Sequence, residues 1–350
     1  VEAVDPALQP LTKVRIQGLK KVFDGNLVAV NGLDLDMYQN SITVLLGHNG
    51  AGKTTTINML TGMLPASGGD AEVFGRSLRH DLHAIRRDLG VCPQHNVLWP
   101  TLSMAEHLTF FARLKGMVHG VEAAVADMIR AVELVDKADV QSGALSGGMK
   151  RRLSVAIALI GGSRLVFLDE PTAGMDPEAR EQTHRLLTAH AKGRVIVLTT
   201  HFMDEADKLG DRVAILSKGS LRCYGSPLFL KARLGVGYHL SINVRDGAPS
   251  APIMAAIDAH VPSAVPKCVA GLEFRFQLPL ETAGQFGPLF RALEHDQAAL
   301  QIASFGIAMT RLEDIFLRIA VESEEVVDGD CLSEAPGSPG PSSSVRSRRS

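Results

Sequence analysis

Residues 47–54 form a glycine-rich segment of the kind that binds phosphate. They read Gly-His-Asn-Gly-Ala-Gly-Lys-Thr and fit the pattern G-x-x-x-x-G-K-[ST] at every fixed position. An apolar run, Ile42–Leu46, precedes them, and Thr55–Leu60 has the pattern of a helix start. Loop N–H groups and the positive end of the helix dipole favour an anion there. Lys53 would follow the phosphates, and the Thr54 hydroxyl would complete a Mg²⁺ shell. The predicted phosphate-binding residues are Gly47, His48, Asn49, Gly50, Ala51, Gly52, Lys53, Thr54 and Thr55.

Two acidic residues follow a second apolar run. Leu165–Leu168 leads into Asp169 and Glu170, and Pro171 then stops the strand. Beside a phosphate loop, the tip of a parallel strand is where Mg²⁺ needs a carboxylate. Asp169 would hold the metal directly or through water, and Glu170 would polarise the attacking water as a general base. Strand ends also carry acids as solvated boundaries, but the upstream phosphate loop favours catalysis.

Residues 145–149, Leu-Ser-Gly-Gly-Met, open a helical run over positions 150–160. A hydroxyl and exposed N–H groups at a helix N-terminus form a second anion-seeking geometry. The three cations at positions 150–152 lie against the helix dipole, at a cost of about 0.3–1 kcal/mol per charge. We expect a nearby anion to offset that cost. A solvated basic helix start is the alternative.

Six motifs occur in the order shown by ABC ATPases, and the chain resembles that family over about residues 14–235. They correspond to the family's Walker A, Q-loop, signature, Walker B, D-loop and switch-histidine motifs, and are residues 47–54, Gln94, 145–149, 168–171, Asp176 and His201. Further stretches resemble subfamily A, the large eukaryotic lipid exporters: 47–56, 91–98, 145–149, 169–177, 201–207 and 310–317. Met149 replaces the family's common Gln, as is usual in subfamily A, and Met175 replaces the usual Leu.

The resemblance implies roles for the remaining candidates. Gln94 would complete the Mg²⁺ shell and report γ-phosphate occupancy to the membrane domains. His201 would hydrogen-bond the γ-phosphate and orient water. Phe23 would stack on adenine, with core packing as the rival interpretation. Family members sandwich two nucleotides between two cassettes, so part of the site would serve the nucleotide of the opposing subunit. The other nucleotide-binding candidates are Ser146, Gly147, Gly148, Met149 and Asp176.

The elements that position these residues read as an α/β fold. Short Val/Ile/Leu-rich runs between helical patterns predict a largely parallel sheet, with candidate strands Ile42–Leu46, Leu165–Leu168, Val195–Thr199 and Val213–Leu216. Val14–Val30 reads as an antiparallel edge with a turn at Asp24-Gly25. Thr101–Asp139 turns helical, with a capping box at Ser103 and Glu106 and a second helix from Val121 to about Leu134. The resemblance makes this a P-loop NTPase of ABC type, with a mixed sheet core, an antiparallel β edge and a helical signature subdomain at about 97–160.

The last third of the chain has a different pattern of apolar residues. Strand-like and helix-like runs alternate and predict a small α+β appendage in ferredoxin-like order: Leu240–Val244, Pro252–His260, Leu272–Leu278, Phe286–His295, Ile302–Ile307 and Thr310–Ile319. The resemblance identifies this part as a regulatory extension. We expect a lead-in at 1–13, an ABC ATPase domain at 14–236, the appendage at 237–320 and a disordered tail or linker at 321–350.

Composition limits the possible partners. The chain is 45% hydrophobic and 21% charged, enough for a sizeable core. Its 36 basic residues against 38 acidic ones argue against a nucleic-acid partner. Four scattered cysteines predict reduced thiols, and no stretch reads as a signal peptide or a membrane span.

We therefore expect Mg-ATP binding and hydrolysis that powers a membrane transporter for lipid export or flipping. A second cassette would complete a nucleotide-sandwich dimer. The chain would lie at the cytosolic face of a membrane and reach it only through the transporter's transmembrane domains. The alternatives are a bacterial-type exporter of drugs or polysaccharide, a soluble ABC ATPase acting on ribosomes or DNA, and a module that holds ATP as a structural ligand. The subfamily stretches, the single cassette and the pair Glu170 and His201 count against them in turn.

Overall fold

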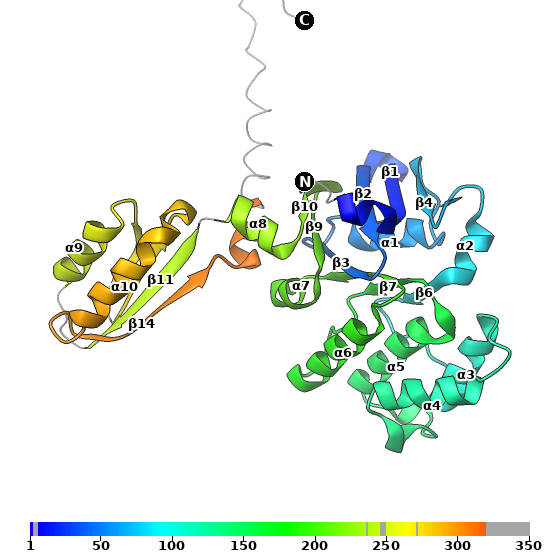
Figure 1. Ribbon diagram of the computed structural model, residues 1–350. Helices are drawn as coiled ribbons and strands as arrows, with labels where there is room; N and C mark the ends of the chain where they lie inside the picture. The colour runs from blue at the N-terminus through cyan, green and yellow to red at the C-terminus, as the bar shows by residue number, and fades with distance from the viewer. Residues whose placement is uncertain (3–5, 236, 246–249, 271, 320–350) are drawn as a thin grey trace, which may run out of the picture.

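The computed structural model describes residues 1–2, 6–235, 237–245, 250–270 and 272–319 (Figure 1). A cassette of two sheets with surrounding helices is followed by a smaller α+β appendage, which lies to one side of it in Figure 1. The predicted tail at 321–350 lies outside the described residues. Among the described residues, no helix is both long enough and apolar enough to cross a bilayer.

The central sheet has six strands in the order β10-β9-β3-β8-β7-β6. All neighbouring strands are parallel except β10 and β9, which are antiparallel. Their bounds are β3 Ser41–Leu46, β6 Leu89–Cys92, β7 Leu165–Asp169, β8 Val195–Thr200, β9 Arg212–Ser217 and β10 Ser220–Gly225. Every residue of β3, β7 and β8 is buried, because both faces of the sheet are covered. All four predicted strands are confirmed, whereas β6 and β10 were not predicted.

A second, antiparallel sheet has the order β2-β1-β4-β5 and packs over the phosphate-loop side of the cassette. Its strands are β1 Thr12–Phe23, β2 Leu27–Tyr38, β4 Gly68–Val73 and β5 Arg76–Ser77. The predicted turn at Asp24-Gly25 is confirmed, and Gly25 takes a φ of 78°, which suits glycine. The hairpin runs on to Tyr38, beyond the predicted end at Val30.

Helices cover both faces of the central sheet. They are α1 Lys53–Leu60, α2 Leu82–Asp88, α3 Met104–Leu114, α4 Val121–Ala131, α5 Gly147–Leu159, α6 Pro177–His190, α7 Met203–Leu209 and α8 Pro227–Leu234. The cassette also contains short 3-10 turns: η1 Pro6–Leu11, η2 Asp24–Asn26, η3 Val135–Lys137, η4 Ser142–Ala144 and η5 Ile160–Gly162. The capping box of Ser103 and Glu106 at α3 is confirmed. Helix α4 ends at Ala131 rather than Leu134, because Glu133 adopts a left-handed φ of 56°.

The appendage follows the order β-α-β-β-α-β, with an antiparallel sheet β12-β13-β11-β14. Its elements are β11 Tyr238–Val244, α9 Ser250–His260, β12 Val265–Ala270, β13 Glu273–Leu278, η6 Leu280–Gln285, α10 Phe286–His295 and β14 Ile302–Met309. The ferredoxin-like order is therefore confirmed. Strand β12 was missed because Pro266 and Lys267 break its apolar pattern, and proline is tolerated on an edge strand. A last helix at 312–319 packs against the cassette core.

Lys115 ties the end of α3 to the end of α5 inside the helical subdomain. Its ammonium group lies 2.9, 3.0 and 2.9 Å from the carbonyl oxygens of Ile157, Ala158 and Ile160, and 2.8 Å from the Ser163 hydroxyl. These carbonyls belong to the last turn of α5, where a helix has no partners of its own and favours a cation. Burial, together with the charge of the Arg194 guanidinium, lowers the pKa of Lys115 to about 8.

Replacing Lys115 with Met should lower the free energy of unfolding by about 1–3 kcal/mol at pH 7, because several carbonyls lose their donor. The gap to the wild type should widen between pH 8 and pH 10.5. In that window the unfolded chain keeps a lysine proton that the folded chain has released, so rising pH favours the folded wild type. Urea unfolding of both proteins at pH 7 and pH 9.5 measures this, and a gap that narrows with pH would contradict it.

Candidate nucleotide site

Three strands of the central sheet bring the predicted site residues to one edge. Strands β3, β8 and β7 are neighbours, and their parallel register pairs Leu46 with Thr200 and Asp169 with Thr199. The residues after these strands are Gly47, His201 and Glu170. The phosphate loop, the switch histidine and the carboxylate pair therefore meet at the carboxyl ends of adjacent strands, where open α/β sheets bind ligands.

The shape of the phosphate loop is set by hydrogen bonds from Lys53 and by close backbone packing at Gly52. Lys53 is buried, and its ammonium group donates to the carbonyl oxygens of Gly47 at 2.6 Å and His48 at 3.1 Å. Gly52 has a φ of 98°, and a Cβ there would lie 2.6 Å from the Ala29 carbonyl oxygen of β2, so only glycine fits. No side chain caps the start of α1, which leaves its first N–H groups for an anion.

The electrostatics around Lys53 come from burial and from the two acids. Burial lowers the pKa of Lys53, while the charges of Glu170 and Asp169 act in the opposite direction. A buried ammonium group with few anionic partners gains from the arrival of a polyphosphate. The loop thus has the charge and the geometry that a triphosphate needs.

Thr199 holds the two acids in place. Asp169 is 5% exposed and accepts a hydrogen bond from the Thr199 hydroxyl, whose oxygen also accepts from the Glu170 N–H at 3.0 Å. Glu170 adopts a φ of 50°, an uncommon conformation for a residue other than glycine. Such conformations cluster at functional sites, where the surrounding structure enforces them.

Glu170 and His201 lie in contact with one another in the lining of a cavity of about 570 Å³. The Glu170 Oε1 atom lies 3.2 Å from the His201 Nδ1 atom. Gly47, His48, Asn49 and Gln94 line the same cavity. A carboxylate and an imidazole placed together beside a phosphate loop suit the activation and orientation of a water molecule.

Arg151 joins the signature helix to the two loops that carry Gln94 and Glu170. It is 3% exposed. Its guanidinium group donates to carbonyl oxygens of both loops: Pro93, Gln94 at 3.0 Å, Asp169, Glu170 at 2.8 Å and Pro171 at 3.2 Å. The planar fork of arginine suits such a set of acceptors. From the sequence, Arg151 was expected only to need a nearby anion, with a solvated helix start as the alternative.

The expectation that a nearby anion offsets the three cations at positions 150–152 stays a prediction. Within one copy of the chain, these cations bond to neutral groups. Lys150 donates to the Gly143 carbonyl oxygen at 3.2 Å, and Arg152 donates to Gln182 Oε1 at 2.9 Å. Together with the Arg151 contacts, these bonds give each of the three cations a neutral acceptor of the same chain, while the Arg152 Nε atom is buried without a hydrogen-bond partner among the described residues. Tertiary packing brings these acceptors to the helix.

Substituting Arg151 with Ala should lower ATP turnover by about 100-fold and lower the free energy of unfolding by about 3–5 kcal/mol, because several buried carbonyls lose their donor. Arg151→Lys should recover only part of both losses, since an ammonium group reaches fewer of the acceptors. Phosphate release and urea unfolding measure the effects, with the exposed Arg185→Ala as control. Wild-type turnover in the alanine variant would refute this role.

The signature and D-loop residues lie apart from this cavity. Ser146 caps α5, and its hydroxyl accepts from the Met149 N–H at 3.3 Å. Asp176 caps α6, where the hydrogen bond from the Ala179 N–H at 2.9 Å lowers the pKa of its carboxyl group. Neither belongs to the lining of the cavity around Glu170, nor do Gly147 and Gly148. Within one copy of the chain, the signature and D-loop residues therefore do not line the cavity that contains Glu170.

Phe23 lies at the end of the β1–β2 hairpin and is 39% exposed, with the Lys21 ammonium group 5.1 Å from its ring centroid. The core-packing interpretation of Phe23 is thus wrong, and its stacking on adenine stays a prediction. Thr54 is exposed and Thr55 half-buried in the first turn of α1.

Three of the predicted site residues carry oxygen donors of the kind that a hard divalent cation prefers. Within the described ranges, no three His, Cys, Asp or Glu side chains form a metal cluster. Mg²⁺ does not need one, because it uses one or two carboxylates or hydroxyls and takes its other ligands from water and substrate phosphates. Asp169, Thr54 and Gln94 are the oxygen donors of this kind.

One buried acid was missed in the sequence. Glu205 of α7 is buried, and its Oε1 atom accepts from the Thr172 hydroxyl at 2.6 Å and lies 3.0 Å from His184 Nε2. Burial raises the pKa of Glu205, but hydrogen bonds from His184, Thr172 and Thr200 outweigh it and leave the pKa lowered. This network links the segment after Glu170 to the helix after His201. Only the three-dimensional fold identifies it.

Comparison with known proteins identifies the families that this chain resembles. The ABC transporter family profile matches residues 30–173, and an ACT-like domain profile matches residues 238–312. "Phospholipid-transporting ATPase ABCA3" of Mus musculus is 47% identical over 87% of this chain, and "ATP-binding cassette sub-family A member 2" of Homo sapiens is 42% identical over 97%. The chain spans 18% and 15% of those two proteins.

Solved structures show the same fold. An ATP-binding subunit of an ABC transporter superposes with a TM-score of 0.59 at 26% identity, over 63% of this chain and 92% of that one. A dimeric ATP-binding cassette with bound ADP and Pi superposes with a TM-score of 0.56 at 23% identity, over 61% of this chain and 98% of that one. The chain is thus an ABC-type ATPase cassette with an ACT-like appendage, similar to the cassettes of sub-family A.

Proposed function

We propose that this cassette hydrolyses Mg-ATP to drive a membrane transporter that exports or flips phospholipid. Lys53 and the loop at 47–52 bind the phosphates, and Phe23 stacks on adenine. Glu170 accepts a proton from the attacking water, and His201 holds the γ-phosphate and that water. The observation that carries the proposal is the shared edge of β3, β8 and β7, where these groups meet.

A magnesium ion would be held by Thr54, Asp169 and Gln94. Bound there, it would neutralise charge on the β- and γ-phosphate oxygens. Gln94 would report γ-phosphate occupancy to the membrane domains. The Gln94 carbonyl oxygen accepts a hydrogen bond from Arg151 of the signature helix, which supports such a link.

A second cassette is the proposed partner. Ser146, Gly147, Gly148 and Met149 would contact the nucleotide of the opposing copy, with Asp176 near the same interface. Two observations support this: these residues do not line their own chain's cavity, and a cassette of the same fold is a dimer with bound ADP and Pi. The partner is either an identical chain or a different cassette.

Transmembrane domains are the other proposed partner, which places the cassette at the cytosolic face of a membrane. A groove of about 350 Å³ between the central sheet and the helical subdomain is lined in part by Leu89, Val91 and Phe111. The exposed Leu114 also lines the groove, and the exposed rings of Trp99 and Phe110 pack against Phe111. Exposed apolar surface of this kind marks interaction sites.

The phospholipid substrate is supported by the similarity to two phospholipid-transporting ATPases, at 47% and 42% identity. The full transporter that carries this cassette, in liposomes with a fluorescent phospholipid, should move lipid only when ATP is present. The Glu170→Gln version should not. ATP hydrolysis without lipid movement would overturn the phospholipid assignment and leave the ATPase intact.

A further inference from the structure

A wall of the nucleotide cavity comes from outside the cassette motifs. The helix at 312–319 contributes Glu313, Phe316 and Leu317 to the cavity lined by His48 and Glu170. This helix directly follows the last strand of the appendage, β14. The appendage therefore reaches the site of ATP hydrolysis through it.

The helix is firmly docked on the cassette. Leu312, Ile315 and Phe316 are 1–3% exposed and belong to the main core of the cassette. Their spacing of three and four residues places them on one helix face. Phe229 and Leu234 of α8 pack against the same core. A face buried this completely is a fixed part of the fold.

Phe316 contacts the phosphate loop itself. Its ring centroid lies 4.4 Å from that of His48, with the ring planes inclined by 50°. The His48 carbonyl oxygen accepts from the Lys53 ammonium group at 3.1 Å and from the Ala51 N–H at 3.1 Å. The position of His48 thus sets both the turn of the loop and an anchor of its essential lysine.

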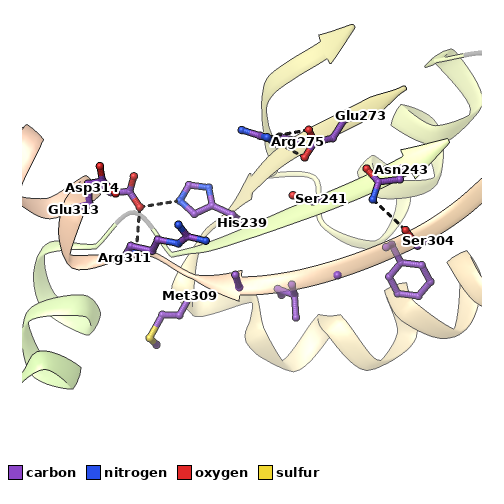
Figure 2. Close-up of a pocket in the computed structure, with 14 residues that line it drawn as sticks. His239, Ser241, Asn243, Glu273, Arg275, Ser304, Met309, Arg311, Glu313 and Asp314 are labelled. Carbon is purple, nitrogen blue, oxygen red and sulfur yellow. Dashed lines mark hydrogen bonds and ion pairs between the residues drawn. The ribbon is translucent and has the colours of Figure 1, made fainter. Parts of the chain in front are cut away.

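The start of the helix is tied to the appendage sheet. The carboxylate of Asp314 accepts from the Arg311 N–H at 3.0 Å and lies 3.7 Å from the Nε2 atom of His239 on β11 (Figure 2). Just before the helix, Thr310 donates to the Gly237 carbonyl oxygen through its N–H at 3.1 Å and its hydroxyl at 2.7 Å. The helix therefore has a fixed orientation relative to the sheet.

We infer that Phe316 is a positioning residue for ATP binding, which holds the phosphate loop in its binding shape by packing its ring against that of His48. The appendage acts on ATP affinity through this contact. The inference rests on the ATPase site described above, and adds to it a residue from the ACT-like part of the chain.

The test uses Phe316→Leu in the full chain, with Phe316→Tyr beside it. Leucine keeps the helix face apolar but removes the ring, so the KM for ATP should rise about 3- to 10-fold while kcat stays near that of the wild type. Tyrosine keeps the ring and should return KM to the wild-type value. Thermal unfolding without nucleotide should show a modest loss for the leucine variant, because the smaller side chain leaves a cavity in the core. Both proteins are therefore assayed well below their unfolding temperatures, which separates positioning from folding.

A double-mutant cycle with His48→Ala tests the contact directly. If the two rings act as a unit, the KM of the double variant should be no higher than that of the single variant with the higher KM. Leu272→Ala, an exposed truncation elsewhere in the appendage, is the control and should leave KM unchanged. Multiplied effects in the double variant, an unchanged KM for Phe316→Leu, or a KM that falls would each overturn the inference. A wild type without ATPase activity would instead overturn the proposed function.

Discussion

Replacing Glu170 with Gln is expected to lower kcat for ATP hydrolysis by about 10²–10⁴-fold while ATP still binds. The amide has nearly the shape of the carboxylate but cannot accept a proton from water. The phosphate loop and Lys53 do not change, so the binding energy of the triphosphate remains. Phosphate release measures turnover, and titration with a fluorescent ATP analogue measures affinity.

The control for that variant is Glu178→Gln, an exposed acid in the first turn of α6 that does not line the cavity. It should hydrolyse ATP like the wild type. If Glu170→Gln keeps normal turnover, the general base lies elsewhere. If it loses ATP binding as well, Glu170 is needed for the shape of the site rather than for the proton transfer.

Lys53→Ala should instead abolish nucleotide affinity, with Kd for ATP rising by about 100-fold or more. The variant loses a buried ammonium group whose hydrogen bonds to Gly47 and His48 shape the loop. A charge-assisted hydrogen bond to phosphate contributes about 1.5–3 kcal/mol, and the loop anchors are lost with it. Isothermal titration with Mg-ATP measures the change.

The exposed Lys192→Ala provides the matched charge control for this substitution, because it removes one ammonium group far from the phosphate loop in the chain. Its Kd should equal that of the wild type. A Lys53 variant that binds ATP normally would show that the phosphates lie at another place.

The sequence predicted the parts of the site that depend on local patterns. The apolar runs before Gly47, Asp169 and His201 are buried strands, because a strand covered on both faces needs continuous apolar residues. The capping box at Ser103 is likewise a local feature, since its two partners lie three residues apart.

The parts that the sequence did not predict depend on contacts between distant segments. Arg151 donates to carbonyl oxygens that lie 57 and 58 residues before it in the chain. The sequence around Arg151 does not indicate which donor will bond to those carbonyls. The 312–319 helix shows an apolar face in the sequence, but nothing in that pattern says that Phe316 meets His48 across the fold. Strand β12 lacks an apolar signature because it is an edge strand with a proline.

A structure of the Glu170→Gln variant with Mg-ATP tests the central claim most directly. We expect the γ-phosphate within hydrogen-bonding distance of Lys53 and His201, with the metal ion beside Asp169 and Thr54. Nucleotide bound away from the edge shared by β3, β8 and β7, or no nucleotide at saturating Mg-ATP, would contradict the assignment of this edge as the catalytic site.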